Sequence, residues 1–276
     1  MTSKGAEVRI TASFLQGTFN SRGLGGFGTV DGGVLASGVL YRSDALSGLT
    51  GQGLQALADH RIGTVIDLRT EAERARAADR LPCDGSVRLV PLPVQGGAMD
   101  ELVQKLLPAG EHAALSEEEI AGIVEQVPTL EELYVAILGS SATEFADIAR
   151  TVVAASGSER PGVLLHCTAG KDRTGLAAAI LLLVANVPRN VIVEDYVRTG
   201  RNLAGTIAEA LISLITTLGV PLTPRLRALA TESPASAIEA AMDWITSEHG
   251  DAAGYLRTGG MTTAEIKKLT QTLRAT

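Results

Sequence analysis

Two residues of complementary chemistry stand six positions apart in the stretch Gly162 to Gly175, the thiol of Cys167 and the guanidinium of Arg173. A thiolate is a strong nucleophile, and a guanidinium can hold two phosphoryl oxygens through paired hydrogen bonds. Because a thiolate and a phosphate repel each other, further donors are needed to bring them together. The pair therefore predicts nucleophilic attack on a phosphoryl group, if the chain between them supplies those donors.

The residues around this pair predict a strand, a tight loop and a helix. Val163 to Leu165 form a short apolar run behind the breaker pair Pro161-Gly162, and Leu176 to Ala185 form an apolar run that is too long for a strand. A loop between a strand and a helix start gathers unpaired N–H groups and the positive end of the helix dipole. Such a loop binds anions and favours the thiolate form of a cysteine. The alternative interpretation is a structural cysteine in an apolar turn.

The ten residues from His166 to Gly175 distinguish between kinds of phosphate loop. A nucleotide-binding loop is excluded, because Asp172 rather than Ser or Thr follows Gly170-Lys171. The string resembles the signature loop of cysteine-dependent protein tyrosine phosphatases, and its Gly-Lys-Asp-Arg part is similar to the bacterial branch that also hydrolyses phosphoinositides. The resemblance implies a phosphomonoester hydrolase that forms a cysteinyl-phosphate and needs no metal or organic cofactor.

The resemblance also implies a role for each residue of the loop. Cys167 attacks phosphorus in line, while Arg173 and the loop amides stabilise the charge of the transferred group. Thr174 is placed to hydrogen-bond the sulfur and ease its departure, and Lys171 adds positive charge. His166 orients the loop from behind or is simply a buried histidine. The residues expected to bind the substrate phosphate are Thr168, Ala169, Gly170, Lys171 and Thr174.

The position where this family often carries its general acid holds a different residue. In the family an Asp often follows a Pro-x-Pro sequence, whereas Val94 follows Pro91-Leu92-Pro93 here. We therefore predict that Asp172, inside the loop, protonates the leaving oxygen. The alternative is that its carboxylate only holds the loop shape through backbone amides. Asp67 and Asp44, at the ends of other predicted strands, are the reserve candidates.

Two segments in the amino-terminal half resemble the same family, which carries Tyr-Arg-Ser and then Asp-Leu-Arg. Because Tyr41-Arg42-Ser43 and Asp67-Leu68-Arg69 end predicted strands, Arg42 and Arg69 should meet Cys167 at the carboxyl ends of a parallel sheet. The earlier family pattern Asn-Phe-Arg-Asp-Leu-Gly-Gly is broken by Asn20-Ser21-Arg22-Gly23. The glycines of this segment, Gly23, Gly25 and Gly26, are predicted to form a flexible turn, with a phosphate cradle as the alternative.

The order of predicted elements indicates an α/β fold with about four central strands, mostly parallel, helices on both faces and a helical carboxyl-terminal layer. No linker is long enough to divide the chain, so residues 1–276 are predicted to form a single phosphatase domain. Residues 95–127 are predicted to be a lid or insertion, with an acidic surface loop as the alternative. Thr70 to Arg80 is interpreted as a solvated helix face, or else as a basic lip for an acidic substrate. Capping boxes predict helix starts at Ser116, Thr129, Ser141 and Thr262.

Composition bounds the location and the partners of the chain. It has 276 residues, 45% of them hydrophobic, and a net charge of −7, which disfavours binding to nucleic acid. Two cysteines are too few for a disulfide framework. The first 21 residues contain no signal-peptide core, and the longest apolar run is too short to span a membrane. A cytoplasmic location is therefore expected, although export without a recognisable signal peptide is compatible with the sequence.

Three interpretations of function stay open. The first is hydrolysis of phosphotyrosine, phosphoinositide or both, with a phosphorylated protein or lipid head group as the substrate. The second is hydrolysis of a small metabolite, such as a nucleotide or sugar phosphate. The third, suggested only by Val94, is a catalytically weak phosphate-binding pseudophosphatase.

Overall fold

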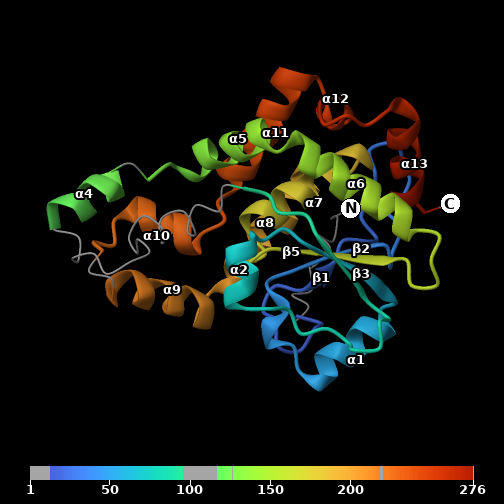
Figure 1. Cartoon of the computed structure of the whole chain (residues 1–276). Coiled ribbons are helices and arrows are strands. Elements are labelled where there is room, and N and C mark those ends of the chain that lie inside the picture. Colours follow the sequence, from blue (N-terminus) through green and yellow to red (C-terminus); the bar gives the residue numbers. More distant parts are fainter. Residues whose placement is uncertain (1–12, 96–116, 126, 218–219, 276) are drawn as a thin grey trace, which may run out of the picture.

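The computed structural model describes residues 13–95, 117–125, 127–217 and 220–275, and it has the predicted α/β architecture (Figure 1). Among these residues, five strands lie in the order β1-β2-β5-β3-β4, and every neighbouring pair is parallel except the edge pair β1-β2. About four strands were predicted. The additional one is β1, whose two residues are too few to show a periodic pattern. The strands are β1 (Arg22–Gly23), β2 (Leu40–Ser43), β3 (Ile62–Asp67), β4 (Arg88–Pro91) and β5 (Gly162–His166).

The sheet is centred on β5, whose alternate residues face two separate hydrophobic cores. Val163 and Leu165 pack in the larger core, whereas Leu164 packs in the smaller one. This alternation is what a pleated strand produces when both faces of the sheet are covered. Helices α6 (Ala142–Ala155) and α7 (Asp172–Val184) cover the side of the larger core, and α1 (Gly51–Asp59) covers the opposite side (Figure 1).

The parallel register aligns polar residues at the carboxyl ends of the three central strands. Ser43 of β2 and Asp67 of β3 are both paired with His166 of β5. Cys167 follows His166 directly, so the loop that contains it begins where the three strand ends meet. The sheet therefore brings together the segments that the sequence had singled out from far-apart positions.

The helices begin largely where their capping residues predict. Thr129 and Thr262 form complete capping boxes, each with the glutamate three residues on. The box predicted at Ser141 is wrong, because that side chain makes no capping hydrogen bond and is buried. The predicted box at Ser116 lies outside the described residues. Among the described residues, the other helices that precede β5 are η1 (Leu46–Gly48), α2 (Glu71–Arg76), α4 (Glu117–Glu125) and α5 (Leu130–Ser140).

The predicted helical layer follows α7 and packs around the larger core. One of its helices, α12, was not predicted, because its seven residues contain a glycine and lie between two longer periodic segments. The layer consists of α8 (Arg189–Leu203), α9 (Thr206–Thr217), α10 (Pro224–Thr231), α11 (Ala235–His249), α12 (Ala252–Thr258) and α13 (Thr263–Leu273). Among the described residues, no helix is long and apolar enough to cross a membrane. The lid predicted at 95–127 falls mainly on residues 96–116 and 126, outside the described residues, and stays a prediction.

Candidate active site

A glycine shapes the loop after β5 at a position that no other residue could fill without strain. Gly170 has a φ of 65°, and a Cβ atom there would lie 2.3 Å from the carbonyl oxygen of Ser43. The missing side chain lets the loop curl close over the end of β2 before α7 begins at Asp172. Cys167 starts this curl, and only 3% of its surface is exposed.

The carbonyl groups of the loop accept hydrogen bonds from neighbouring segments, whereas its amides have no partner among the described residues. The oxygen of Thr168 accepts from the amide of Ala45 at 3.0 Å. The oxygen of Gly170 accepts from Asn20 Nδ2 at 3.0 Å and from Arg42 Nη2 at 2.7 Å. Within the described part of the chain, the amides from Thr168 to Arg173 donate no hydrogen bond to the protein. Such a row of unpaired N–H groups at the start of α7 has the donors that an anion would need.

A buried ion-pair network fixes these rear donors. Asp195 of α8 accepts from Arg42 Nη1 at 2.7 Å and from Arg22 Nε at 2.6 Å. Arg22 Nη1 in turn donates to the backbone oxygen of Asn20 at 3.0 Å. Burial opposes the ionisation of Asp195, but the two guanidinium groups outweigh it and lower its pKa to about 2. The network therefore keeps a charged carboxylate deep in the molecule, where it holds Arg42 against the loop.

The amino-terminal segment that seemed to break the family pattern is part of this support. Asn20 and Arg22 are both buried, and they keep the Asn and the Arg of the pattern. The turn predicted around Gly23, Gly25 and Gly26 is confirmed at Gly25 and Gly26, where Gly26 has a φ of 85°, but not at Gly23. Gly23 lies in β1, and a Cβ atom at Gly25 would lie 2.5 Å from the Cα atom of Ser37.

The guanidinium of Arg173 is oriented by a carboxylate from α2. Glu73 accepts from Arg173 Nη1 at 2.7 Å through Oε2 and from Nη2 at 2.6 Å through Oε1. Its Oε1 also accepts from the hydroxyl of Thr168 at 2.5 Å. Burial opposes the ionisation of Glu73, but Arg173 and Thr168 outweigh it and lower its pKa to about 2. Because the carboxylate takes the two Nη groups, Nε of Arg173 stays available to an anion in the loop.

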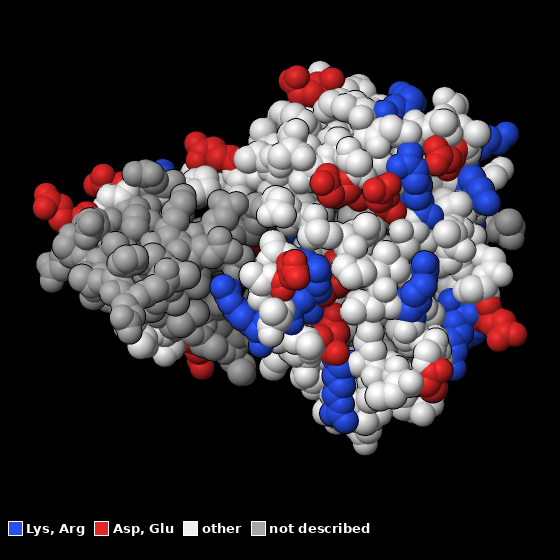
Figure 2. Space-filling model, viewed as in Figure 1, with Lys and Arg blue, Asp and Glu red and all other residues white. Residues whose placement is uncertain are grey.

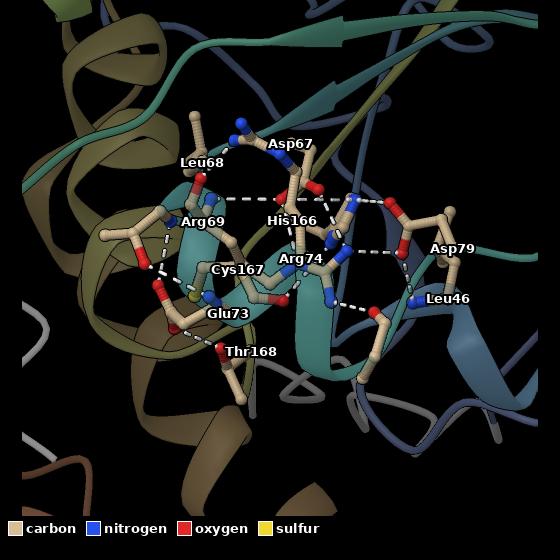
Figure 3. Close-up of polar contacts among 12 residues, drawn as sticks. Leu46, Asp67, Leu68, Arg69, Glu73, Arg74, Asp79, His166, Cys167 and Thr168 are labelled. Carbon is tan, nitrogen blue, oxygen red and sulfur yellow. Dashed lines mark hydrogen bonds and ion pairs between the residues drawn. The ribbon is translucent and has the colours of Figure 1, made fainter. Parts of the chain in front are cut away.

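A second cluster lies behind the loop and surrounds His166 (Figure 3). Nδ1 of His166 lies 3.2 Å from the carbonyl oxygen of Cys167, and Nε2 lies 3.1 Å from Asp79 Oδ2. Arg69 Nη2 bridges Asp67 at 2.8 Å and Asp79 at 2.9 Å. Burial opposes the ionisation of Asp79, but His166 and Arg69 outweigh it and lower its pKa. The cluster therefore contacts the backbone of Cys167 through His166, whose orienting role stays a prediction.

The same cluster contains the side-chain types of a metal site, but it does not fit a metal. Ligand atoms of Asp67, Asp79 and His166 lie within 4.8 Å of one another. The positive charge that these carboxylates need is already supplied by the guanidinium of Arg69, which contacts both of them.

The charged segment from Thr70 to Arg80 is only partly the solvated face that was predicted. Glu71 and Arg76 are exposed, whereas Glu73 is buried and the side chain of Asp79 is 1% exposed. The two buried acids serve the two clusters around Cys167, as Figure 3 shows with Glu73 on one side of this residue and Asp79 on the other. An amphipathic helix pattern could not distinguish these acids from their exposed neighbours.

Three further residues of the loop make different contacts. Asp172 Oδ1 accepts from the hydroxyl of Tyr134 at 2.7 Å, and its side chain is 20% exposed. Lys171 points away from the amides, because its Nζ donates to the backbone oxygens of Leu229 at 2.6 Å and Glu232 at 3.0 Å. The hydroxyl of Thr174 is buried and has no hydrogen-bond partner among the described residues, so the predicted bond to the sulfur is not formed in this structure.

The reserve candidates for the general acid are already engaged. Both oxygens of Asp67 accept from Arg69. Asp44 accepts from the amides of Phe19 and Asn20, and burial raises its pKa. Val94 is fully buried in the larger core, and its amide donates to the oxygen of Leu68 at 3.1 Å. The position after Pro-x-Pro is therefore part of the packing here.

Glu73, Asp195, Asn20 and Arg22 were not among the predicted site residues. For Asn20 and Arg22 a signal existed, because both letters of the family pattern are present. For Glu73 the signal was its place three residues after Thr70, where it completes a capping box. Asp195 carries no local signal, since it lies in the middle of a helix and meets its two partners only in the folded chain.

Comparison with known proteins identifies one matching family and several relatives. The tyrosine phosphatase family matches residues 14–275. A tyrosine-protein phosphatase of Nostoc commune is 32% identical over 164 residues, which are 59% of this chain and 49% of that protein. The triple specificity protein phosphatase PtpB of Mycobacterium tuberculosis is 29% identical over 272 residues, which are 92% of this chain and 96% of that protein. The crystal structure of P. aeruginosa TpbA covers 82% of this chain and 88% of its own, with 16% identity and a TM-score of 0.37, too low to place any residue.

Proposed function

This chain belongs to the tyrosine phosphatase family, and from that premise we propose that it hydrolyses phosphomonoesters through a cysteinyl-phosphate intermediate. The observation that carries the proposal is the row of unpaired amides from Thr168 to Arg173, which follows one thiol and ends at one oriented guanidinium. These groups supply the donors that a thiolate and a phosphate need in order to approach each other.

In the first step the sulfur of Cys167 attacks phosphorus, an S–P bond forms and the P–O bond to the leaving group breaks. The amides and Nε of Arg173 bind the three equatorial oxygens, whose charge develops in this step. Asp172 gives its proton to the leaving oxygen. In the second step water attacks phosphorus, the S–P bond breaks, phosphate is released and Asp172 takes the proton of the water.

We propose phosphotyrosine as the preferred substrate and a phosphoinositide head group as the second candidate. A polyphosphorylated ligand would gain from a cation directed at its additional phosphates, but the ammonium of Lys171 is bound by two backbone oxygens of the α10 region. On the face shown in Figure 2, basic and acidic side chains are interspersed and do not form one basic patch. Recognition is therefore expected to rest on one phosphoryl group in the loop.

The test compares the wild type with Cys167→Ser and with the matched control Cys83→Ser, because Cys83 is exposed and Cys167 is buried in the loop. We expect Cys167→Ser to lose turnover on the order of 10⁴-fold or more while it still binds inorganic phosphate, since the amides and Arg173 remain. Cys83→Ser should keep the activity of the wild type. Hydrolysis by Cys167→Ser at the rate of the wild type would contradict the covalent mechanism.

The same preparation separates the substrate classes and the pseudophosphatase. A panel of phosphotyrosine peptide, phosphoserine peptide, phosphoinositide head group and nucleoside monophosphate ranks the substrates by kcat/KM. Mass spectrometry after acid quenching should find one phosphoryl group on the peptide that contains Cys167. Binding of phosphate without that adduct, and without turnover of any member of the panel, would favour the pseudophosphatase.

A further inference from the structure

Two buried tyrosine hydroxyls form a chain that ends on Asp172. Tyr134 Oη of α5 donates to Asp172 Oδ1 at 2.7 Å, and Tyr196 Oη of α8 lies 2.7 Å from Tyr134 Oη. The two rings pack edge to face with their centroids 6.0 Å apart. The exposed fractions of Tyr134 and Tyr196 are 0% and 1%, so bulk water does not compete for these hydrogen bonds.

The number of available hydrogens determines which hydroxyl is the donor in each of these two hydrogen bonds. A phenol donates one hydrogen, and that of Tyr134 goes to the carboxyl group of Asp172. Tyr196 must therefore donate to Tyr134. Burial raises the pKa of both phenols above the value of a free tyrosine, and that of Tyr134 is well above it. Both hydroxyls thus stay protonated at neutral pH, and a donor always faces Asp172.

The hydrogen bond from Tyr134 reaches only one of the two carboxyl oxygens of Asp172. Oδ1 of Asp172 accepts from Tyr134 and lies 3.5 Å from Lys171 Nζ. Within the parts of the chain that the structure describes, Oδ2 accepts no hydrogen bond from the protein. Because Oδ1 is held by a rigid aromatic donor, the carboxyl group keeps one orientation and Oδ2 is the oxygen that can carry an exchangeable proton.

We propose that Tyr134 is a positioning residue for Asp172, and that Tyr196 keeps the hydroxyl of Tyr134 in its donating orientation. In the first step the proton on Oδ2 of Asp172 passes to the leaving oxygen as the P–O bond breaks, and in the second step Oδ2 takes a proton from the attacking water. The inference rests on the proposed role of Asp172 as the general acid. It adds two side chains from α5 and α8 that act through Asp172.

The dependence on the leaving group tests this role. A general acid matters most for a poor leaving group, such as a phenol with a pKa of about 10, and least for 4-nitrophenol. For the full chain we expect Tyr134→Phe to lower kcat/KM for phenyl phosphate about tenfold and for 4-nitrophenyl phosphate less than about twofold. Asp172→Asn should show the same preference more strongly. Inhibition by inorganic phosphate should be unchanged in Tyr134→Phe, because the loop amides are intact.

A double mutant and a matched control test whether the hydroxyl of Tyr134 acts through Asp172. Adding Tyr134→Phe to Asp172→Asn should cause no further loss, because the hydroxyl acts through the carboxyl group. Tyr196→Phe should give the same preference as Tyr134→Phe but a smaller loss. Tyr255→Phe is the control, since this buried phenol donates to the backbone oxygen of Leu138 in α5 at 2.7 Å. It removes one hydrogen bond to the same helix and should leave the ratio between the two substrates unchanged.

Two outcomes would overturn the inference, and they differ. Tyr134 is structural if Tyr134→Phe lowers kcat/KM equally for both substrates, or lowers it by the same factor in the Asp172→Asn background as in the wild type. The role of Asp172 is then untouched. If Asp172→Asn itself shows no dependence on the leaving group, the general acid lies elsewhere and the positioning role ends with it. The attack by Cys167 would survive either result.

Discussion

At the scale of single residues, the alignment of Arg173 depends on how one carboxylate is shared. Glu73 accepts from both Nη groups of Arg173, from the hydroxyl of Thr168 and from the amide of Thr70, which together use its four lone-pair sites. A glutamine would replace one acceptor oxygen by an NH₂ group that faces donors. The direction of Arg173 therefore depends on a residue that never touches the substrate in the proposed mechanism.

We expect Glu73→Gln to lower kcat/KM by roughly 10- to 100-fold and to weaken inhibition by inorganic phosphate, because the guanidinium is no longer held toward the loop. Glu71→Gln is the matched control, since Glu71 is an exposed residue of the same helix. Steady-state kinetics with thermal melting separates the two effects. Equal loss of activity in both variants would show that the charge of α2, and not the contact with Arg173, matters.

At the scale of elements, three segments are joined by one buried charge. Asp195 of α8 pairs with Arg22 of β1 and Arg42 of β2, and all three side chains are nearly inaccessible. We expect Asp195→Asn to lower the free energy of unfolding by about 3–5 kcal/mol, because it leaves two buried guanidinium groups without a counter-charge. Chemical denaturation measures this change. The control Asp243→Asn removes the partner of Arg189 in a pair that is 43% and 71% exposed, and should cost about 1 kcal/mol or less.

An Asp195→Asn variant as stable as the wild type would mean that other groups compensate the two arginines. Thr199 is the first to examine, since its hydroxyl already accepts from Arg22 at 3.0 Å. Even then, Arg42 would have lost the carboxylate that orients it, and Arg42 donates to the oxygen of Gly170. We therefore expect the loop after β5 to be less ordered in this variant. Weaker inhibition by phosphate would reveal that loss.

The position of each element along the chain explains which parts of the site could be predicted from the sequence. The strand, loop and helix around Cys167 follow one another in the sequence, so local patterns were enough to find them, and Arg42 and Arg69 were placed because parallel strand ends share one edge. Glu73, Asp195 and Tyr134 reach the site from α2, α8 and α5, and their positions are set by helix packing. A helical pattern shows which face is buried but not which buried polar residue meets which partner.

At the scale of the whole molecule, the low pKa values of two buried carboxyl groups make folding sensitive to acid. Glu73 and Asp195 have a pKa of about 2 in the folded chain, against 4.5 and 3.8 as ordinary values. A lowered folded pKa contributes stability that is complete above the ordinary value and is lost as the pH falls toward the folded one. The raised pKa of Asp44 acts in the opposite direction. We expect the melting temperature to fall between about pH 4.5 and pH 2, and less steeply in Asp195→Asn.

A wild-type profile that stays flat across this range would mean that the two buried pairs do not control acid stability. The comparison with Asp195→Asn assigns part of the slope to one group, because the asparagine cannot titrate. Calorimetry at a series of pH values gives both curves from the same preparations.

The burial of these ion pairs also separates two effects of ionic strength. Dissolved salt screens charges that face water over a Debye length of about 8–10 Å, but it reaches closed pairs such as Arg173–Glu73 and Arg42–Asp195 very little. A chain with a net charge of −7 repels an approaching phosphate at long range, and salt weakens that repulsion. Changes in the salt around this protein should therefore alter how often a phosphate arrives, while the loop that receives it keeps its shape.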